Sequence, residues 1–209
     1  MEIYPEFKDI DDVLHIEVIQ ALRDAIEVKN PYTRGHSDRV SELSVLMGEK
    51  LRLPGEDLVT LRVGGLFHDI GKIGMLDEIL SKTTKLTDKE FLEIQKHPVI
   101  GEYILSKSPM FKDILPIIKH HHERYDGAGY PDKLSGENIP YLARMTTVCD
   151  AFDAMTTKRS YRDSLPLDTV KSELSKHKGT QFDPKIADVF LDIIKYHLDE
   201  IEEIQRRHS

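Results

Sequence analysis

Histidine and aspartate occur in adjacent pairs at two places where they could bind metal ions. His68 is followed directly by Asp69, and His121 is followed directly by His122. Two neighbouring side chains at the frayed end of a helix can reach a common point, and the Asp69 carboxylate could bridge two cations. A bridging carboxylate is what two metal ions about 3.5–4 Å apart require. The pairs therefore indicate a centre for two metal ions.

Three further residues could complete such a centre. His36, His97 and Asp150 each fall at or near the inner face of a different predicted helix, so all these groups could converge inside a helical bundle. A mixture of imidazole and carboxylate suits iron, manganese or zinc, whereas structural zinc favours thiolates and calcium favours an all-oxygen shell. The single cysteine, Cys149, excludes a multi-cysteine zinc cage. The residue types therefore indicate a transition metal such as iron, manganese or zinc, and they do not distinguish among these three.

These signals also have a simpler interpretation. A single inward-facing histidine, such as His36, is more often a hydrogen-bonded core residue than a ligand. Consecutive histidines can simply end a helix, where they interact with the exposed carbonyl groups. Spacing and periodicity alone therefore leave both interpretations open.

Apolar residues at helical spacing predict the elements that would position these ligands. His36 shares a helical face with Leu43 and Met47, so this histidine should point towards the interior. In the following helix His68 is in phase with the apolar residues, and Gly71 can stop that helix. His68 should therefore lie at an inner C-terminal end.

The remaining elements are predicted as helices too. Thr87 and Glu90 form a capping box for a helix that reaches His97, where Pro98 interrupts or restarts it. Other helices are expected at residues 10–28, from about 114 to 122, and at 140–157, 166–178 and 184–206. The charged end of the last helix should face solvent. Residues 126–136 read as a loop. The sequence thus predicts one all-α bundle of about seven to nine helices.

Length and composition fit one ordinary globular domain. The chain has 209 residues, of which 39% are hydrophobic and 32% charged, enough to bury a sizeable core. No apolar run approaches the roughly 20 residues of a membrane span, and the acidic N-terminus is unlike a signal peptide. We therefore expect a cytoplasmic protein. The net charge of -8 argues against a nucleic-acid polymer as partner.

Two longer motifs resemble the signatures of a known family. The segments HDIGK at residues 68–72 and HHERYDGAGYP at residues 121–131 resemble the two signatures of the HD-GYP subfamily of HD-domain phosphohydrolases. The similarity extends through residues 32–40, 97–98 and 149–162. A resemblance of this length is highly specific.

The resemblance covers roughly residues 12–195 and implies a domain at residues 12–209 behind a lead-in at residues 1–11. It also implies an all-helical bacterial enzyme that hydrolyses cyclic di-GMP, a second messenger. Family members hold two or three metal ions, commonly iron or manganese. The bacterial origin, the substrate and the choice of iron or manganese come from the resemblance and not from composition or spacing.

The resemblance places the metal ligands at specific positions, with Asp69 as the bridging carboxylate. The implied ligands are His36, His68, Asp69, His97, His121, His122 and Asp150. Some members have a glutamate four residues before the first ligand histidine, where this sequence has Tyr32, and a phenol is a poor substitute. We therefore expect two divalent metal ions, iron or manganese, rather than three. The third metal is associated with the second cleavage, so linear pGpG is the expected main product, with some further cleavage to GMP.

Three basic residues are expected to bind the substrate. Lys72 lies one turn beyond His68 and could place its ammonium on a phosphate oxygen; otherwise it is a solvated lysine at a helix end. Arg159 and Arg162 follow the Asp150 helix and could present guanidinium groups to phosphodiester oxygens from one side. Their alternative is an ordinary surface position.

Asp153 and Tyr130 have two interpretations each. Asp153 follows Asp150 on the same helix face and could orient a ligand histidine or a metal-bound water, or else form a salt bridge with Arg159. Tyr130 could stack on a guanine or contact a partner. The Gly127–Pro131 loop that carries it could recruit a diguanylate cyclase or a sensory-domain protein.

The expected chemistry is hydrolysis by a hydroxide that bridges the metal ions. Asp69, Lys72 and Asp153 are the expected catalytic side chains. Three alternatives remain: an HD-type hydrolase of another nucleotide or cyclic dinucleotide, a non-catalytic cyclic di-GMP signalling scaffold, and dioxygen chemistry at a di-iron site. The complete ligand set counts against a scaffold, and the basic residues favour a phosphate substrate over dioxygen.

Overall fold

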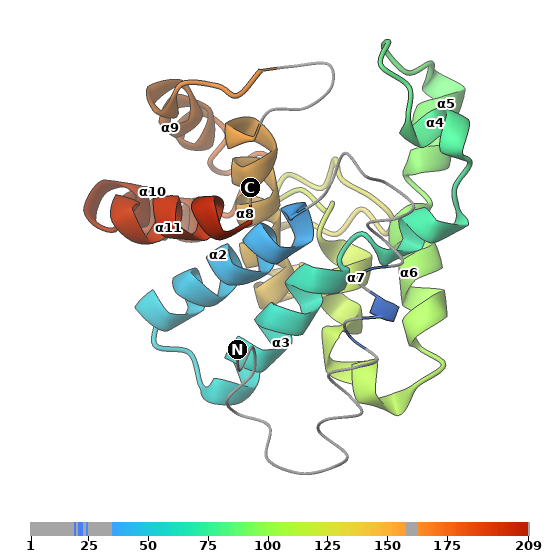
Figure 1. The fold of residues 1–209 in the computed structure, drawn as a ribbon, viewed down its shortest axis with the longest axis horizontal. Helices are drawn as coiled ribbons and strands as arrows, with labels where there is room; N and C mark the ends of the chain where they lie inside the picture. The colour runs from blue at the N-terminus through green and yellow to red at the C-terminus, as the bar shows by residue number, and fades with distance from the viewer. Residues whose placement is uncertain (1–18, 20, 23, 25–34, 158–162, 209) are drawn as a thin grey trace.

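All regular elements in the described part of the chain are helices (Figure 1). The computed structural model describes residues 19, 21, 22, 24, 35–157 and 163–208. Within these ranges the strand-like pairing is limited to one isolated bridge between Lys178 and Phe182. The prediction of an all-α fold is therefore confirmed.

The described part of the chain contains ten α-helices, and three of the connections between them include a short 3₁₀ turn. The α-helices are α2 (His36–Lys50), α3 (Gly55–Phe67), α4 (Asp77–Leu80), α5 (Asp88–Ile94), α6 (His97–Leu105), α7 (Leu115–His120), α8 (Tyr141–Thr156), α9 (Leu167–Lys176), α10 (Pro184–Tyr196) and α11 (Leu198–Arg207). The 3₁₀ turns are η2 (Ile70–Gly74), η3 (Pro109–Ile114) and η4 (Gly136–Asn138).

The helices pack around two apolar clusters. The larger cluster joins α2, α8, α9, α10 and α11, and fully buried members include Leu43, Phe152 and Phe190. The smaller one lies between α3, α6 and α7 and includes Phe67 and Ile118. Helix α2 packs against both α3 and α8, whereas α9, α10 and α11 lie at one side of the molecule and α4, α5 and α6 at the other (Figure 1). The candidate ligands lie on α2 and α8, directly after α3 and α7, and at the first residue of α6.

The predicted capping box and the restart of the chain at His97 are confirmed, although the helix that Thr87 begins ends at Ile94 and not at His97. Thr87 caps α5, because its hydroxyl accepts from the Glu90 amide while the Glu90 carboxylate accepts from the Thr87 amide. Pro98 lies in the first turn of α6. The backbone N–H groups of a first turn have no partner within the helix, so the N–H that proline lacks costs no hydrogen bond there. The chain therefore restarts as a helix at His97.

The prediction of one continuous helix over residues 184–206 with a solvated end is wrong. The chain leaves the helical conformation at His197, with φ -137° and ψ 33°, and begins again as α11 at Leu198. The break allows α11 to pack against α2 and α10, where Ile201 and Ile204 are buried in the larger cluster. Apolar burial of that face explains why the end does not project into solvent.

Some predictions concern residues outside the described ranges. Of the helix expected at residues 10–28, the structure describes Ile19, Ala21, Leu22 and Asp24, which are helical. The lead-in at residues 1–11, Tyr32, Arg159 and Arg162 lie outside the described residues.

Among the described residues, none of the helices combines the length and the apolar character that crossing a membrane would take.

Candidate metal centre

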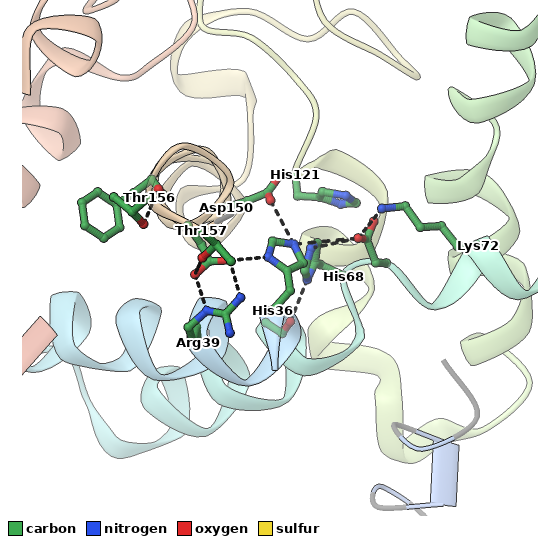
Figure 2. A network of polar contacts seen from close by, with 12 residues as sticks. His36, Arg39, His68, Lys72, His121, Asp150, Thr156 and Thr157 are labelled. Carbon is green, nitrogen blue, oxygen red and sulfur yellow. Dashed lines mark hydrogen bonds and ion pairs between the residues drawn. The ribbon is translucent and has the colours of Figure 1, made fainter. Parts of the chain in front are cut away.

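The candidate ligands come together from the ends of several helices. His36 and His97 are the first residues of α2 and α6, and His68 and His121 directly follow the last residues of α3 and α7. Asp150 lies in the second half of α8. Figure 2 shows His36, His68, His121 and Asp150 converging on one point.

Asp69 lies in the middle of the group. Its Oδ1 is 3.3 Å from Nε2 of His97, and its Oδ2 is 3.4 Å from Nε2 of His68 and 4.0 Å from Nε2 of His36. The Nε2 atoms of His97 and His121 are 3.3 Å apart. The two carboxylate oxygens therefore face different histidines.

The ligand atoms form two sets that share Asp69. One set is His36, His68 and Asp69, and the other is Asp69, His97, His121 and His122. Within each set the ligand atoms all lie within 4.8 Å of one another. Asp150 lies beside the first set, with Oδ1 3.3 Å from Nε2 of His36. The predicted ligands thus occupy two neighbouring positions with one common carboxylate.

Four of the histidines are oriented through their other ring nitrogen. Nδ1 of His68, His97 and His121 lies 2.7, 2.7 and 2.9 Å from the carbonyl oxygens of Gly65, Ile94 and Ile118. Nδ1 of His36 lies 2.6 Å from Oδ2 of Asp153. An oxygen acceptor requires the proton on Nδ1, so the tautomer leaves the Nε2 lone pair facing the centre. This is the orientation of a metal-binding imidazole.

Two ligand atoms at the centre have unsatisfied hydrogen-bonding capacity. Nε2 of His68 and Oδ1 of Asp69 are buried and make no hydrogen bond with any described residue. A buried polar atom without a partner costs about 1–3 kcal/mol. Such atoms need an explanation, and a bound cation would satisfy both. The residues present therefore fit a divalent metal centre.

The charges of the centre favour a cation. Burial alone would raise the pKa of Asp69, but Lys72, His68 and His97 hold it well below its usual value. Burial lowers the pKa of His97 and of His122 to about 3. Asp69 is therefore ionised and these imidazoles are neutral near pH 7, as ligands must be.

The surroundings of His36 differ from those of the other histidines. Burial would lower its pKa, but hydrogen bonds to Asp150 and Asp153 raise it to about 9. Two carboxylates therefore favour a positive charge at this end of the centre. A metal ion there would replace the proton as the compensating charge.

Lys72 lies beside the shared carboxylate. Its Nζ is 2.5 Å from Oδ2 of Asp69, and its side chain is 21% exposed whereas that of Asp69 is 5% exposed. Figure 2 shows Lys72 approaching the centre from η2. Lys72 therefore pairs with the buried Asp69 carboxylate while part of its side chain remains exposed to solvent. A solvated lysine at a helix end would not make this contact.

Tyr130 packs against one of the candidate ligands. Its ring centroid lies 5.0 Å from that of His122, with the planes 32° apart, and 6.5 Å from that of Phe91 in α5, with the planes 83° apart. The Tyr130 amide donates to the carbonyl of His122 at 3.3 Å. The structure therefore places an aromatic side chain next to the centre, with a half-exposed phenylalanine beside it.

The loop that carries Tyr130 is held by Glu123. The buried Oε1 of Glu123 accepts from the Asp132 amide at 2.7 Å. A Cβ on Gly129 would lie 2.4 Å from the Arg124 nitrogen, so only glycine permits this close approach. Glu123 thus fixes the far end of the loop.

Three residues that contribute to this region were not predicted: Arg39, Glu123 and Phe91. Arg39 donates two hydrogen bonds to Asp153, the carboxylate that orients His36. Glu123 directly follows two predicted ligands in the motif, which was the available signal for it. Arg39 lies within the segment of residues 32–40 that resembles the family, but neither its sequence position nor that of Phe91 indicates which residues they contact. Arg159 and Arg162 lie outside the described residues, so their predicted roles stay predictions.

Comparison with known proteins identifies related chains. The model of a family described as "HD domain" matches residues 20–186. A 3′3′-cGAMP-specific phosphodiesterase 3 of Vibrio cholerae is 35% identical over 176 residues, which are 84% of this chain and 38% of that protein. The cyclic di-GMP phosphodiesterase response regulator RpfG of Xanthomonas campestris is 38% identical over 177 residues, 84% of this chain and 47% of that protein.

A cyclic di-GMP phosphodiesterase of Thermotoga maritima is similar along nearly the whole sequence. It is 34% identical over 205 residues, which are 97% of this chain and 54% of that protein. The chain thus spans between 38% and 54% of the length of these three relatives.

Solved structures share the helical fold. An HDG"Y"P protein from Bdellovibrio bacteriovorus aligns with a TM-score of 0.64 and 23% identity, covering 77% of this chain and 51% of that one. The HD domain of the phosphodiesterase PgpH from L. monocytogenes aligns with a TM-score of 0.62 and 19% identity, covering 87% of this chain and 98% of that one. At these identities the likeness establishes the fold.

Proposed function

The chain belongs to the HD-domain family, within its HD-GYP type, and on that premise we propose that it is a metal-dependent phosphodiesterase that hydrolyses cyclic di-GMP. The proposed main product is linear pGpG, with some further cleavage to GMP. The observation that carries the proposal is the position of Asp69, whose carboxylate belongs to both ligand sets. A phosphodiesterase centre with two metal ions needs such a shared ligand.

The proposed metal ligands divide between two metal ions in the way that the two ligand sets around Asp69 do. His36, His68 and Asp150 would hold one divalent ion, and His97, His121 and His122 the other, with Asp69 common to both. The mixed imidazole and carboxylate shell supports iron or manganese. The chemistry that bound ions would supply is stabilisation of the charge that develops on the scissile phosphate, together with an acidified water as nucleophile.

Lys72 is the proposed partner of the scissile phosphate. Its ammonium lies at the boundary between the buried carboxylate of Asp69 and solvent, where an arriving phosphodiester would meet a positive charge. A lysine has three donors and can contact a phosphate oxygen while it remains close to Asp69. Arg159 and Arg162 are proposed as further phosphate contacts.

The remaining catalytic proposal concerns Asp153. Its carboxylate accepts from Nδ1 of His36 and from Arg39, which supports a role in holding the imidazole rather than in binding a water. In this role Asp153 orients the Nε2 lone pair of His36 towards the first metal position.

Tyr130 is the proposed contact for a guanine base. Its ring is packed against His122 and is followed towards solvent by Phe91. These rings offer a stacking surface beside the candidate metal ligand His122, and base stacking on an aromatic ring contributes about 1–3 kcal/mol. Burial raises the pKa of Tyr130, so its hydroxyl stays protonated and can donate a hydrogen bond.

A second candidate substrate is 3′3′-cGAMP. It is favoured by the 35% identity to a Vibrio cholerae phosphodiesterase that carries this substrate in its name. Both dinucleotides contain a guanine and two phosphodiester bonds, so stacking on Tyr130 does not separate them. Discrimination would depend on the second base.

Two further proposals follow from the same premise. The Gly127–Pro131 loop, in which Ala128 is exposed, is the proposed contact for a diguanylate cyclase or a sensory-domain protein. The proposed location is the cytoplasm, where such a second messenger acts.

The test of the proposed function is a panel of nucleotides given in parallel to protein purified anaerobically with manganese. The panel contains cyclic di-GMP, 3′3′-cGAMP, cyclic di-AMP and pGpG, and the products are separated by chromatography. We expect the highest kcat/KM with cyclic di-GMP and accumulation of pGpG. Faster hydrolysis of another member of the panel would reassign the substrate. If metal-loaded protein hydrolysed none of them, the proposal that the chain is a phosphodiesterase would be refuted.

A further inference from the structure

Arg39 connects the C-terminal end of α11 with the carboxylate that orients His36. The Arg39 side chain is buried, and it donates from Nε to Oδ1 of Asp153 at 2.6 Å and from Nη2 to Oδ2 at 3.1 Å. Its third contact is from Nη1 to the carbonyl oxygen of His208 at 2.6 Å. Figure 2 shows Arg39 in α2 on the side of His36 away from Lys72.

The Asp153 carboxylate is fully engaged by these donors. Besides Arg39, it receives Nδ1 of His36 at 2.6 Å and the hydroxyl of Thr157 at 3.2 Å. Asp153 is 1% exposed, so solvent does not supply a replacement for a lost donor. The direction of the His36 ring therefore depends on Asp153, and the position of Asp153 depends on Arg39.

The end of α11 is itself held against α2. Nε2 of His208 lies 2.8 Å from Oε1 of Glu42, and Arg207 lies 3.0 Å from the other oxygen. A Cβ on Gly35 would lie 2.2 Å from the His208 carbonyl oxygen, which shows how closely this turn approaches the start of α2. The carbonyl that receives Arg39 is thus in a fixed position.

A further hydrogen bond ties α11 to α8. The side-chain amide of Gln205 donates to the hydroxyl of Thr156 at 3.0 Å. Helix α11 therefore contacts both helices that carry the pair of His36 and Asp153, near the ends at which these two residues lie.

The other anchored histidines have local support. His68, His97 and His121 are oriented by backbone carbonyls of the residues three positions before them. These acceptors belong to the same stretch of chain as the histidine, so they do not depend on α11. Of these four histidines, His36 is the one oriented by a side chain from another helix.

We propose that Arg39 is a positioning residue for the metal ion that His36 binds, and that the C-terminal turn of α11 supports this position from outside. The inference rests on the metal centre of the proposed function. If this turn separated from α2, metal binding at the position of His36 would weaken. Binding at the position of His97, His121 and His122 would be unchanged. Helix α11 would thereby control the occupancy of one metal position.

The test compares Arg39→Gln with the matched control Arg144→Gln. Arg144 also joins a buried aspartate, Asp183, to a backbone carbonyl, that of Ile139, but it lies in the first turn of α8. Both substitutions remove a guanidinium that lies between a carboxylate and a carbonyl; that of Arg39 is buried and that of Arg144 is partly buried, with its side chain 11% exposed. The two substitutions should lower thermal stability by similar amounts. A difference between them in metal affinity would therefore report the positioning role of Arg39.

The measurement is anaerobic titration of each variant of the 209-residue chain with Mn²⁺ by calorimetry, which gives the number of ions and each affinity. We expect two ions for the wild type and for Arg144→Gln. For Arg39→Gln we expect one affinity about 10–100-fold weaker, as for other residues that orient a ligand, and the second unchanged. Two unchanged affinities in Arg39→Gln, or equal weakening of both ions, would overturn the inference.

Two further variants keep the test decisive. If Arg39→Gln does not fold, Arg39→Lys takes its place. The lysine retains the charge, but its single nitrogen cannot reach all the acceptors of the three guanidinium nitrogens, so the same weakening of one metal affinity is expected. Glu42→Gln releases the His208 turn without touching Asp153, and it should weaken the same single metal position by a smaller factor. A wild type that binds no Mn²⁺ would refute the metal centre itself, whereas a wild type with two ions and unaffected variants would refute only the role of Arg39.

Discussion

Oδ1 of Asp69 lies 3.3 Å from Nε2 of His97, although Asp69 lies in the turn between α3 and η2 and His97 is the first residue of α6. Its other oxygen faces His36 and His68. A single side chain therefore takes part in both candidate metal positions, and this arrangement is the basis of the predictions that follow.

Substitution Asp69→Ala should remove both metal ions and abolish hydrolysis, because no other residue is shared between the two ligand sets. The helical fold should persist, since neither apolar cluster includes Asp69. Metal analysis, an activity assay and circular dichroism of the same preparation check this. His97→Ala is the matched variant and should lose ligation at one position only. Full activity of Asp69→Ala would contradict the shared carboxylate.

Substitution Lys72→Gln should leave both metal ions bound and lower kcat/KM for cyclic di-GMP. A charge-assisted hydrogen bond contributes about 1.5–3 kcal/mol, which corresponds to roughly a tenfold to hundredfold decrease. Steady-state kinetics and metal analysis check the two parts separately. Lys96→Gln, which removes an exposed lysine paired with Glu93, is the control. An unchanged kcat/KM would show that Lys72 has no contact with the substrate.

Substitution Tyr130→Ala should raise KM for cyclic di-GMP at least about fivefold, because it removes the proposed stacking surface for a base. Tyr130→Phe retains the ring and should stay close to wild type. The small substrate bis(p-nitrophenyl) phosphate has no purine, so its hydrolysis reports whether the metal centre is intact. Equal losses on both substrates would mean that Tyr130 supports the centre instead of binding a base.

Substitution of Arg159 or Arg162 by Ala should weaken substrate binding by about 1.5–3 kcal/mol for each lost charge-assisted contact. KM should therefore rise by roughly tenfold or more, while kcat changes less. Arg206→Ala, which removes a partner of Glu203 at the surface, is the control. An unchanged KM would assign both arginines to the surface.

The sequence predicted the helical fold and the convergence of ligands because both depend on local patterns. Apolar periodicity placed His36 and His68 on inner faces, and they are buried. The resemblance to a known family supplied what periodicity could not, since inward histidines alone are equally well explained as core residues. Both kinds of signal lie within short segments of the chain.

Arg39 could not be assigned from the sequence. It lies within the segment of residues 32–40 that resembles the family, but its position does not indicate a role, and its partner Asp153 lies in a helix far along the chain. Packing of α2 against α8 brings the two together, and no local pattern encodes that packing.

The break at His197 was missed for a related reason. Ile194 and Ile201 are seven residues apart, so the apolar period continues through the break as it would in one helix. The chain bends there because the apolar face of α11 is buried against α2, a long-range contact.

The most direct test of the central claim is anaerobic purification with quantification of metal, followed by product analysis on cyclic di-GMP in that same preparation. The shared carboxylate of Asp69 predicts close to two divalent ions per chain, iron or manganese by the ligand types, and a centre with two ions predicts pGpG as the main product. A preparation with two ions per chain that releases no product from cyclic di-GMP or from 3′3′-cGAMP would contradict it.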